Sequence, residues 1–542
     1  MATCHCPEPA QCLHRPLLSP ATSYPRLHGR PRPAAGRGGG GVIGEVASIL
    51  SLTGPMVGAG ILFYLRSLVS MVFLGRLGQL PLAGGSLALG FANITGYSVL
   101  SGLAGGMDPV CGQAFGAGRT DLLRAALRRT VLLLLAASVP IAALWVAMHR
   151  VLLATGQDAD IAAAAYAYIL CCLPDLAVQS FLHPIRIYLR AQSVTLPLTY
   201  AAAAALLLHV PINYLLVGAH GLGIRGVALG GVWTNLNFLL FLVAYVYFSG
   251  MYGAHDDDGG EPKKGAADAP AEAAAEGAGE WWSLVLLCVH SCTSVCLEWW
   301  WYEIMVLLCG VLVDPKAAVA AMGVLIQTTS LIYIFPHSLG CAVSTRVGHE
   351  LGAGRPERAR LVARVGLGLG AALGVVACAF AVSVRGVWAR MFTADAAILK
   401  LAAAALPLLG LAELGNCPQT AGCGVLRGSA RPEKAARINV SAFYGVGMPV
   451  ALALAFWPAG LDFRGMWGGM LAAQLVCAAL MLRAVLGTDW PEQTERARQL
   501  TGGGSDGHHV VGIVDDDKRS HAEGAKPKTE VASTLFMVAD CV

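Results

Sequence analysis

The sequence carries little charge for its length. Of its 542 residues only 13% are Asp, Glu, Lys or Arg, whereas 56% are hydrophobic, and soluble domains usually have about 25% charged residues. The formal net charge of +4 is spread along the chain, so we expect no basic surface of the kind that binds nucleic acid. The composition therefore predicts a membrane protein.

Catalytic motifs are also missing. The sequence contains no G-x-x-x-x-G-K-[ST] phosphate-binding loop, which argues against ATP-driven pumping by this chain. It contains no Ser-His-Asp arrangement and no zinc-protease motif either. A group of cysteines and histidines in the first 14 residues fits no common zinc-ligand spacing. We therefore expect no enzyme activity, no cofactor and no metal site.

Long apolar runs dominate the sequence. A membrane-spanning helix needs about 20 largely apolar residues, and this length predicts an all-α membrane protein with twelve transmembrane helices. Pro, Arg and Gly dominate residues 1–42, which we predict to be a disordered tail rather than a secretory signal peptide. We predict a flexible linker at 250–280 and a second disordered tail at 488–542. The predicted spans are 46–74, 83–107, 126–148, 160–182, 196–217, 227–249, 282–311, 318–343, 362–384, 396–422, 438–457 and 466–487.

The distribution of basic residues predicts the orientation in the membrane. Arginines cluster in the loops that follow the second, eighth and tenth predicted spans, whereas the alternate loops hold mostly single charges. Cytoplasmic loops are enriched in Lys and Arg, so we expect both tails and the linker to be cytoplasmic. The sequence does not distinguish a plasma membrane from an endomembrane such as the vacuole, the Golgi or an endosome.

The chain contains an internal repeat. The string GQAFGAGR begins at Gly112 and GHELGAGR begins at Gly348, a shift of 236 positions (348 − 112). A second pair, GLGIRG at 221–226 and GLDFRG at 460–465, is shifted by 239 (460 − 221). Six spans return a chain to its starting side, so the lobes at 43–249 and 281–487 should be parallel repeats around a central cavity.

Away from their ends, the predicted spans contain four acidic residues, Asp175, Glu298, Glu303 and Glu413. A charge at the bilayer centre costs at least ~2.5 kcal/mol, and burial raises the pKa of a carboxyl group, so such acids can exchange protons near neutral pH. The alternative is a fixed ion pair, for which Arg66 is one available cation. At 100° per residue Glu298 and Glu303 are about 140° apart. We therefore expect Glu298 to face the cavity with Glu413, and Glu303 to point toward a neighbouring helix.

Several polar and aromatic side chains in the spans are candidates for the lining of a solute cavity. Each can instead form a packing hydrogen bond between helices. Asp108 precedes a proline at the end of the second predicted span, and a local helix-end role explains it. The candidate lining residues are Tyr64, Asn93, Asn213, Gln327 and Tyr333.

Several strings resemble the plant branch of the multidrug and toxic compound extrusion (MATE) transporters. These are FLGRLGQLPLAGGSLA, GMDPVCGQAFGAG, FLHPIRIYLRAQ, CLEWWWYEI, STRVGHELGAGRP and ELGNCPQTAGCGVLRG, and the resemblance covers about residues 45–487. It implies an antiporter that exchanges an organic solute for protons through outward-open and inward-open states. The family's acids on the seventh and tenth helices match Glu298, Glu303 and Glu413.

The sequence departs from the family pattern in places. His349 stands where Asn is usual, and the first and eighth predicted spans contain no acid, so proton coupling must use fewer carboxylates. We expect Arg119 and Arg355, in the two repeated GAGR strings, to contribute to a cytoplasmic gate. The expected partners are a small organic solute, protons and the lipid bilayer, and the expected state is a monomer.

Two alternative functions remain open at this stage. A major-facilitator carrier also has two six-helix halves, but its loop between the second and third helices usually holds an Asp-Arg pair with Gly-Arg-Arg, where this chain has QAFGAGR. A membrane sensor or scaffold would signal through its tails. In that case deletion of 1–40 and 490–542 should abolish function, and substitution of the acids should not.

Overall fold

The computed structural model describes residues 41–251, 270–456 and 460–502. In this part of the chain every regular element is a helix, and twelve segments are long and apolar enough to cross a membrane. They coincide with the twelve predicted spans, so the predicted fold class is confirmed. The N-terminal Cys/His group and most of both predicted tails and the linker lie outside the described residues.

The first half of the chain forms six spans; a π-helical segment interrupts the second span, and another forms the end of the fifth. Proline inside α1, α5, α6 and α7 is accommodated, because neighbouring helices compensate for the missing hydrogen bond. The elements are α1 (Val42–Leu77), α2 (Gln79–Ala92), η1 (Asn93–Tyr97), α3 (Ser98–Gly105), α4 (Met107–Gly116), α5 (Thr120–Ala154), α6 (Ala159–Ala191), α7 (Leu196–Asn213), η2 (Tyr214–Ala219) and α8 (Gly223–Phe248).

The second half repeats this plan and adds a terminal helix. Its helices begin at recognisable signals, since Asp314 and Asp395 accept hydrogen bonds from the first backbone N–H groups of α10 and α12. The elements are α9 (Pro270–Cys309), α10 (Pro315–Gly352), α11 (Pro356–Val384), η3 (Trp388–Met391), α12 (Ala396–Gly428), α13 (Pro432–Asn439), η4 (Val440–Gly447), α14 (Met448–Phe456), α15 (Phe463–Leu486) and α16 (Trp490–Leu500).

Two predicted boundaries are wrong. Helix α9 begins at Pro270, so residues 270–280 are helical rather than part of a linker. Helix α16 occupies the start of the segment that we predicted to be disordered from 488 onward. Its start has ordinary local signals, because Asp489 caps it and a proline follows in the first turn. The polar composition of the whole tail concealed these signals.

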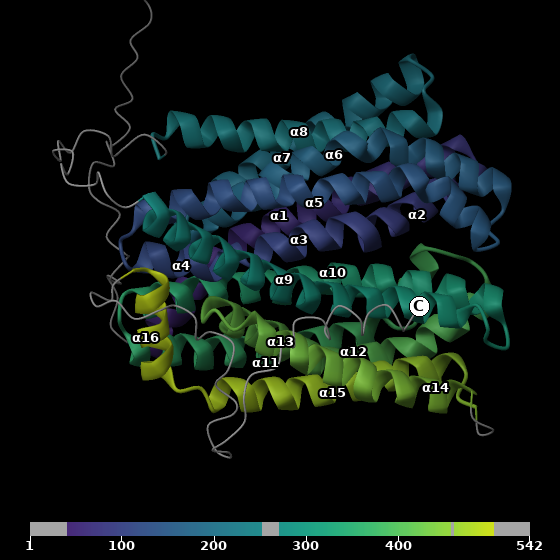
Figure 1. Ribbon diagram of the computed structural model, residues 1–542. Helices are drawn as coiled ribbons and strands as arrows, with labels where there is room; N and C mark the ends of the chain where they lie inside the picture. The colour runs from purple at the N-terminus through teal and green to yellow at the C-terminus, as the bar shows by residue number, and fades with distance from the viewer. Residues whose placement is uncertain (1–40, 252–269, 457–459, 503–542) are drawn as a thin grey trace, which may run out of the picture.

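The two halves form two lobes, the N-lobe from α1 to α8 and the C-lobe from α9 to α15, which lie side by side in Figure 1. At their interface α1 packs against α10, and the second span of the first half packs through α3 against α9. The first span of each lobe thus contacts the second span of the other. Such reciprocal contacts are expected when a two-fold pseudo-axis relates two parallel repeats.

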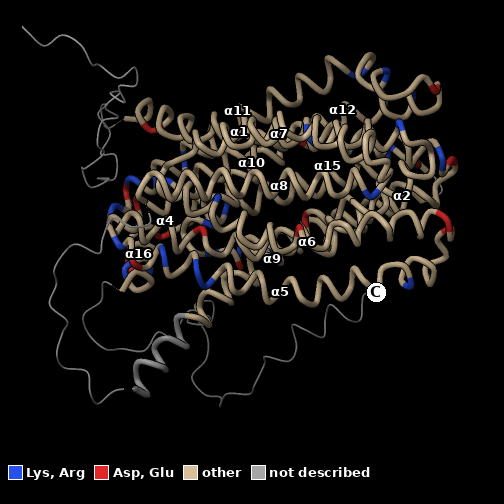
Figure 2. The backbone as a smooth tube through the Cα atoms, turned by 90° about the horizontal axis from the view of Figure 1, so that it is seen from above, with Lys and Arg blue, Asp and Glu red and all other residues tan. Residues whose placement is uncertain are grey.

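The repeated GAGR strings form identical turns. Gly118 and Gly354 have φ values of 75° and 73°, in the left-handed region that favours glycine. The N–H of the following arginine, Arg119 or Arg355, donates to the residue five positions earlier at 2.8 Å in both loops. Both turns lie at the same end of the bundle, with the start of α1 and with α16 (Figure 2). We call it the GAGR end, and Lys and Arg gather there in Figure 2.

Candidate functional site

A cavity of about 320 Å³ lies between the lobes. One wall is the π-helical turn η1 of the N-lobe, and the others are α9 and α10 of the C-lobe. Indole, phenol, hydroxyl and carboxyl groups surround it, which suits a flat organic solute with a polar or charged group. The lining residues are Asn93, Ile94, Glu298, Trp299, Trp300, Tyr302, Glu303, Ile326, Thr329, Ser330 and Tyr333.

Both carboxylates of the seventh span line this cavity. Glu298 faces the cavity, but Glu413 is not among the lining residues, and the expectation that Glu303 points to a neighbouring helix is wrong. An angle of 140° between two side chains keeps them out of the same cavity only when the cavity is narrow and touches one face of the helix. The actual cavity extends around α9, because Trp299, Trp300 and Tyr302 also line it. Two acids can therefore share one cavity without sharing one helix face.

Glu413 lies behind the cavity wall on α12. Its side chain is buried, with Asn416 Nδ2 donating to Oε2 at 2.8 Å, and Gln474 Nε2 of α15 donates to Asn416 Oδ1 at 3.4 Å. Glu413 is close enough to Glu298 for electrostatic interaction, and Tyr302 interacts with both acids. The acids of the seventh and tenth spans therefore form one group inside the C-lobe.

In the part of the chain that the structure describes, no cation pairs directly with this acid group. In the described ranges the ion pairs involve other carboxylates, and none includes Glu298, Glu303 or Glu413. The fixed-ion-pair alternative therefore has no support at these three positions. An acid in such a place is most easily accommodated when it carries a proton.

A line of polar groups leads from Glu298 toward the GAGR end. Gln419 of α12, His337 and Arg427 are close enough to Glu298 to interact with it electrostatically. Arg427 in turn pairs with Asp108 of the N-lobe at 3.5 Å. Sequence patterns did not assign Gln419, His337 or Arg427 to this site, although Gln419 and Arg427 lie inside the string ELGNCPQTAGCGVLRG.

Asp175 belongs to a separate network in the N-lobe. Its two carboxylate oxygens accept from Asn235 Nδ2 at 2.9 and 3.0 Å, and Asn235 Oδ1 accepts from Arg66 Nη1 at 3.0 Å. Arg66 thus neutralises Asp175 through an amide rather than by direct contact. The structure does not bring Asp175 together with the other three acids, and Gln179 and Tyr97 complete its hydrogen bonds.

The predicted cavity residues divide into two groups. Asn93 and Tyr333 line the cavity, whereas Tyr64, Asn213 and Gln327 do not. Asn213 is buried in the N-lobe, where its side-chain amide donates to the backbone oxygen of His209 at 2.8 Å. The hydrogen bonds of Asn213 therefore stay within α7 and do not join two helices.

At the GAGR end the two lobes touch through backbone. Helices α4 and α10 meet at glycines four residues apart in each helix, a spacing that allows close helix contact in membranes. A Cβ atom at Gly112 would lie 3.4 Å from Cα of Gly348, and one at Gly352 would lie 2.0 Å from the oxygen of Gln113. Gln113 Nε2 also donates to the oxygen of Gly428 at 3.0 Å. The bundle is closed at this end.

Two ion-pair clusters join the lobes at the same end. Arg346 of α10 binds both carboxylate oxygens of Glu45 of α1 at 2.9 Å. Asp108 pairs with Arg190 in its own lobe and with Arg427 across the interface, so the local helix-end interpretation of Asp108 is wrong. These partners are up to 319 positions apart, which no local pattern can detect.

The two predicted gate arginines differ in their contacts. Arg355 pairs with Glu350 of its own lobe at 2.6 Å, and Glu350 also pairs with Arg346 at 3.0 Å. Arg119 instead binds Asp121 and, at 2.6 Å, the backbone oxygen of Thr501 after α16. Repeat-related residues thus have different partners.

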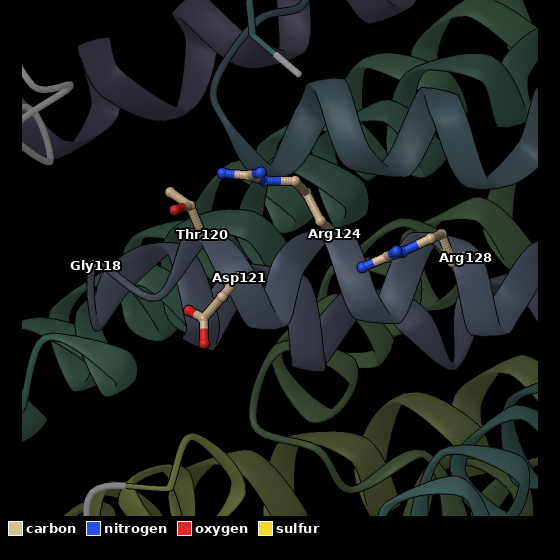
Figure 3. A pocket seen from close by; sticks show the side chains of 5 residues that line it. All are labelled: Gly118, Thr120, Asp121, Arg124 and Arg128. Atoms are coloured by element: carbon tan, nitrogen blue, oxygen red, sulfur yellow. The ribbon is translucent and has the colours of Figure 1, made fainter. Parts of the chain in front are cut away.

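A second cavity, of about 460 Å³, lies on the first turns of α5 (Figure 3). Its lining includes Thr120, Asp121, Arg124 and Arg128. Arg124 and Arg128 are one turn apart on the same face of the helix, at the GAGR end. This basic surface is separate from the acid group.

The fold and the cavity define a twelve-span membrane protein of two repeated lobes with an acid-lined space between them, which is the architecture of a transporter rather than an enzyme. The MatE family model matches residues 55–215 and 291–453, one copy in each lobe. The chain is 56% identical over 469 residues to Protein DETOXIFICATION 49 of Arabidopsis thaliana, which covers 86% of this chain and 90% of that protein. The chain belongs to the MatE family of multidrug and toxin efflux transporters.

Solved structures agree with this assignment. The eukaryotic MATE transporter AtDTX14 is similar with a TM-score of 0.77 and 30% identity, over 85% of this chain and 99% of that one. An outward-facing MATE transporter of the MOP superfamily has a TM-score of 0.68 at 16% identity, over 84% and 97% of the two chains. The second likeness concerns the fold alone.

Proposed function

We propose that this protein exports organic solutes in exchange for protons, by alternating access to the cavity between its lobes. The observation that carries the proposal is the group formed by Glu298, Glu303 and Glu413, which lies at the cavity without an ion-pair partner among the described residues. A proton or a cationic solute can neutralise such a group, and the two then compete. When a proton and a cationic solute compete for the same negative charge, binding of one releases the other, and this is the simplest basis of exchange.

The proposed coupling runs from Glu298 to the GAGR end through Arg427. When Glu298 is ionised, its field holds Arg427, which also pairs with Asp108 across the lobes. When Glu298 takes up a proton, that attraction disappears, whereas the pair between Arg427 and Asp108 remains. Protonation in the C-lobe thereby changes the strength of an interlobe contact, as a coupled transporter requires.

The closed GAGR end suggests which state the structure represents. If that end is cytoplasmic, as its Arg-rich loops indicate, the cavity is closed to the cytoplasm and the protein faces outward. Opening to the cytoplasm then requires α4 and α10 to separate at their glycines. The same motion breaks the Glu45–Arg346 and Asp108–Arg427 pairs.

Transport into proteoliposomes tests the proposed energy source. We expect an imposed pH gradient, with the membrane potential clamped, to drive accumulation of at least one organic solute from a panel of cations and anions. Each pH unit supplies ~1.4 kcal/mol per proton. Accumulation that ignores the pH gradient and follows a sodium gradient would refute proton coupling.

Cysteine labelling tests the orientation. Thr120→Cys and Pro356→Cys, each next to a GAGR string, should resist a membrane-impermeant maleimide applied outside intact right-side-out cells. Gln157→Cys, in the loop between α5 and α6 at the other end of the bundle, is the matched control and should react. Labelling of both GAGR sites from outside, with Gln157→Cys protected, would show that the topology is inverted.

A further inference from the structure

Helix α16 lies across the GAGR end rather than along the bundle. Figure 1 shows it roughly perpendicular to the spans, reaching from α11 and α15 toward α4. It packs against α10 and α11 of the C-lobe, and its inner face, with Trp490, Gln493, Thr494 and Ala497, is buried. Arg431 of the C-lobe also donates to Thr488, just before the helix, at 3.0 Å. The helix is therefore anchored to the C-lobe.

The far end of α16 reaches the other lobe. Arg119 Nη1 of the N-lobe donates to the backbone oxygen of Thr501 at 2.6 Å, and a Cβ atom at Gly502 would lie 2.9 Å from the same nitrogen. One turn earlier, Arg498 Nη2 would lie 3.6 Å from a Cβ atom at Gly354. The last turn of α16 thus lies between the two repeat-related GAGR loops.

The charges at this contact are complementary. The last carbonyl groups of a helix carry partial negative charge, so a cation there is stabilising, and a charged donor makes a stronger hydrogen bond than a neutral one. The internal repeat explains why Arg119, rather than Arg355, binds the backbone oxygen of Thr501. The position equivalent to Glu350, which holds Arg355, is Ala114 in the N-lobe (350 − 236), so Arg119 has no such acid on α4.

We propose that α16 is an interlobe strap, anchored on the C-lobe, that stabilises the closed GAGR end through the bond between Arg119 and Thr501. Separation of α4 from α10 moves Arg119 away from α16, so each opening at this end breaks the bond. This proposal depends on the proposed function in one respect, namely that the GAGR end opens during transport. Its effect is a bias on the equilibrium between states and involves no proton.

The rate of alkylation at Cys341 tests the strap in the full-length protein without a gradient or solute. Cys341 is buried at the lobe interface near Arg427, so N-ethylmaleimide should reach it mainly when that end opens. We expect Arg119→Gln to raise the alkylation rate of Cys341, measured by peptide mass spectrometry, by about tenfold, the size of effect expected for one charge-assisted hydrogen bond. Cys309, buried near the other end of α9, is the internal reference and should not change.

Two further variants make the result specific. Arg119→Lys keeps a charged donor and should restore a rate close to that of the wild type. Arg124→Gln removes a charge in the first turns of α5, five residues from Arg119, and should match the wild type. An unchanged Cys341 rate in Arg119→Gln, or an equal rise in Arg124→Gln, would overturn the strap. If Arg119→Gln raises the alkylation rate of Cys341 but the wild-type protein shows no proton-driven transport, the result counts against the proposed function and not against the strap.

Discussion

Glu413→Gln and Glu298→Gln should each give a folded, membrane-inserted transporter that no longer responds to a pH gradient. Glutamine has the shape of a protonated glutamate, so Asn416 keeps a hydrogen-bonding partner at position 413, but glutamine cannot release a proton. We expect gradient-driven accumulation in proteoliposomes to fall by more than tenfold in both variants. Downhill solute movement should persist, because the cavity keeps its shape.

Two comparisons make this prediction specific. Glu303→Gln should be milder and act mainly on the apparent affinity for solute, because Glu303 lines the cavity and, among the described residues, forms no ion pair at the GAGR end. Glu357→Gln, an exposed acid in the first turn of α11, is the matched control and should leave transport unchanged. Normal gradient-driven transport by correctly folded Glu298→Gln would show that Glu298 is not the proton-coupling residue.

Gly352→Leu should prevent the lobes from closing at the GAGR end. A Cβ atom there would lie only 2.0 Å from the oxygen of Gln113, and the obstacle is backbone that cannot rotate away. The protein should remain open at that end, with gradient-driven transport reduced more than tenfold and Cys341 alkylated far faster than in the wild type. Transport and alkylation are measured on the same purified preparation.

The matched control for this variant is Gly368→Leu on α11. No atom lies within 4 Å of a Cβ at that position, so the same added side chain should leave transport and alkylation near wild-type values. A monodisperse Gly352→Leu protein that transports normally, with Cys341 still protected, would show that the α4–α10 contact is not part of the transport cycle.

Local patterns predicted much of this fold. The twelve spans follow from runs of apolar residues, and the division into two six-span lobes follows from the internal repeat. The candidate acids could be found because any carboxylate inside an apolar span is unusual. Each of these signals is contained in a short stretch of sequence or in a comparison of two stretches.

The contacts between distant residues could not be predicted in this way. Nothing near Glu45 indicates that Arg346, 301 positions away, is its partner, and Asp108 has an adequate local explanation that is wrong. The placement of Glu303 failed because helix geometry gives the angle between two side chains but not the width of the cavity beside them. Helix α16 was missed because its buried face depends on α10 and α11, which are remote in the sequence.

The central claim is that solute and protons move in opposite directions in one coupled cycle. Its most direct test is proton movement driven by solute alone, in proteoliposomes loaded with a transported solute and an internal pH-sensitive dye, with no initial pH gradient and the membrane potential clamped. The account predicts that the lumen acidifies as solute leaves, and that Glu413→Gln vesicles lose solute without acidification. Solute exit from wild-type vesicles at constant internal pH would contradict it.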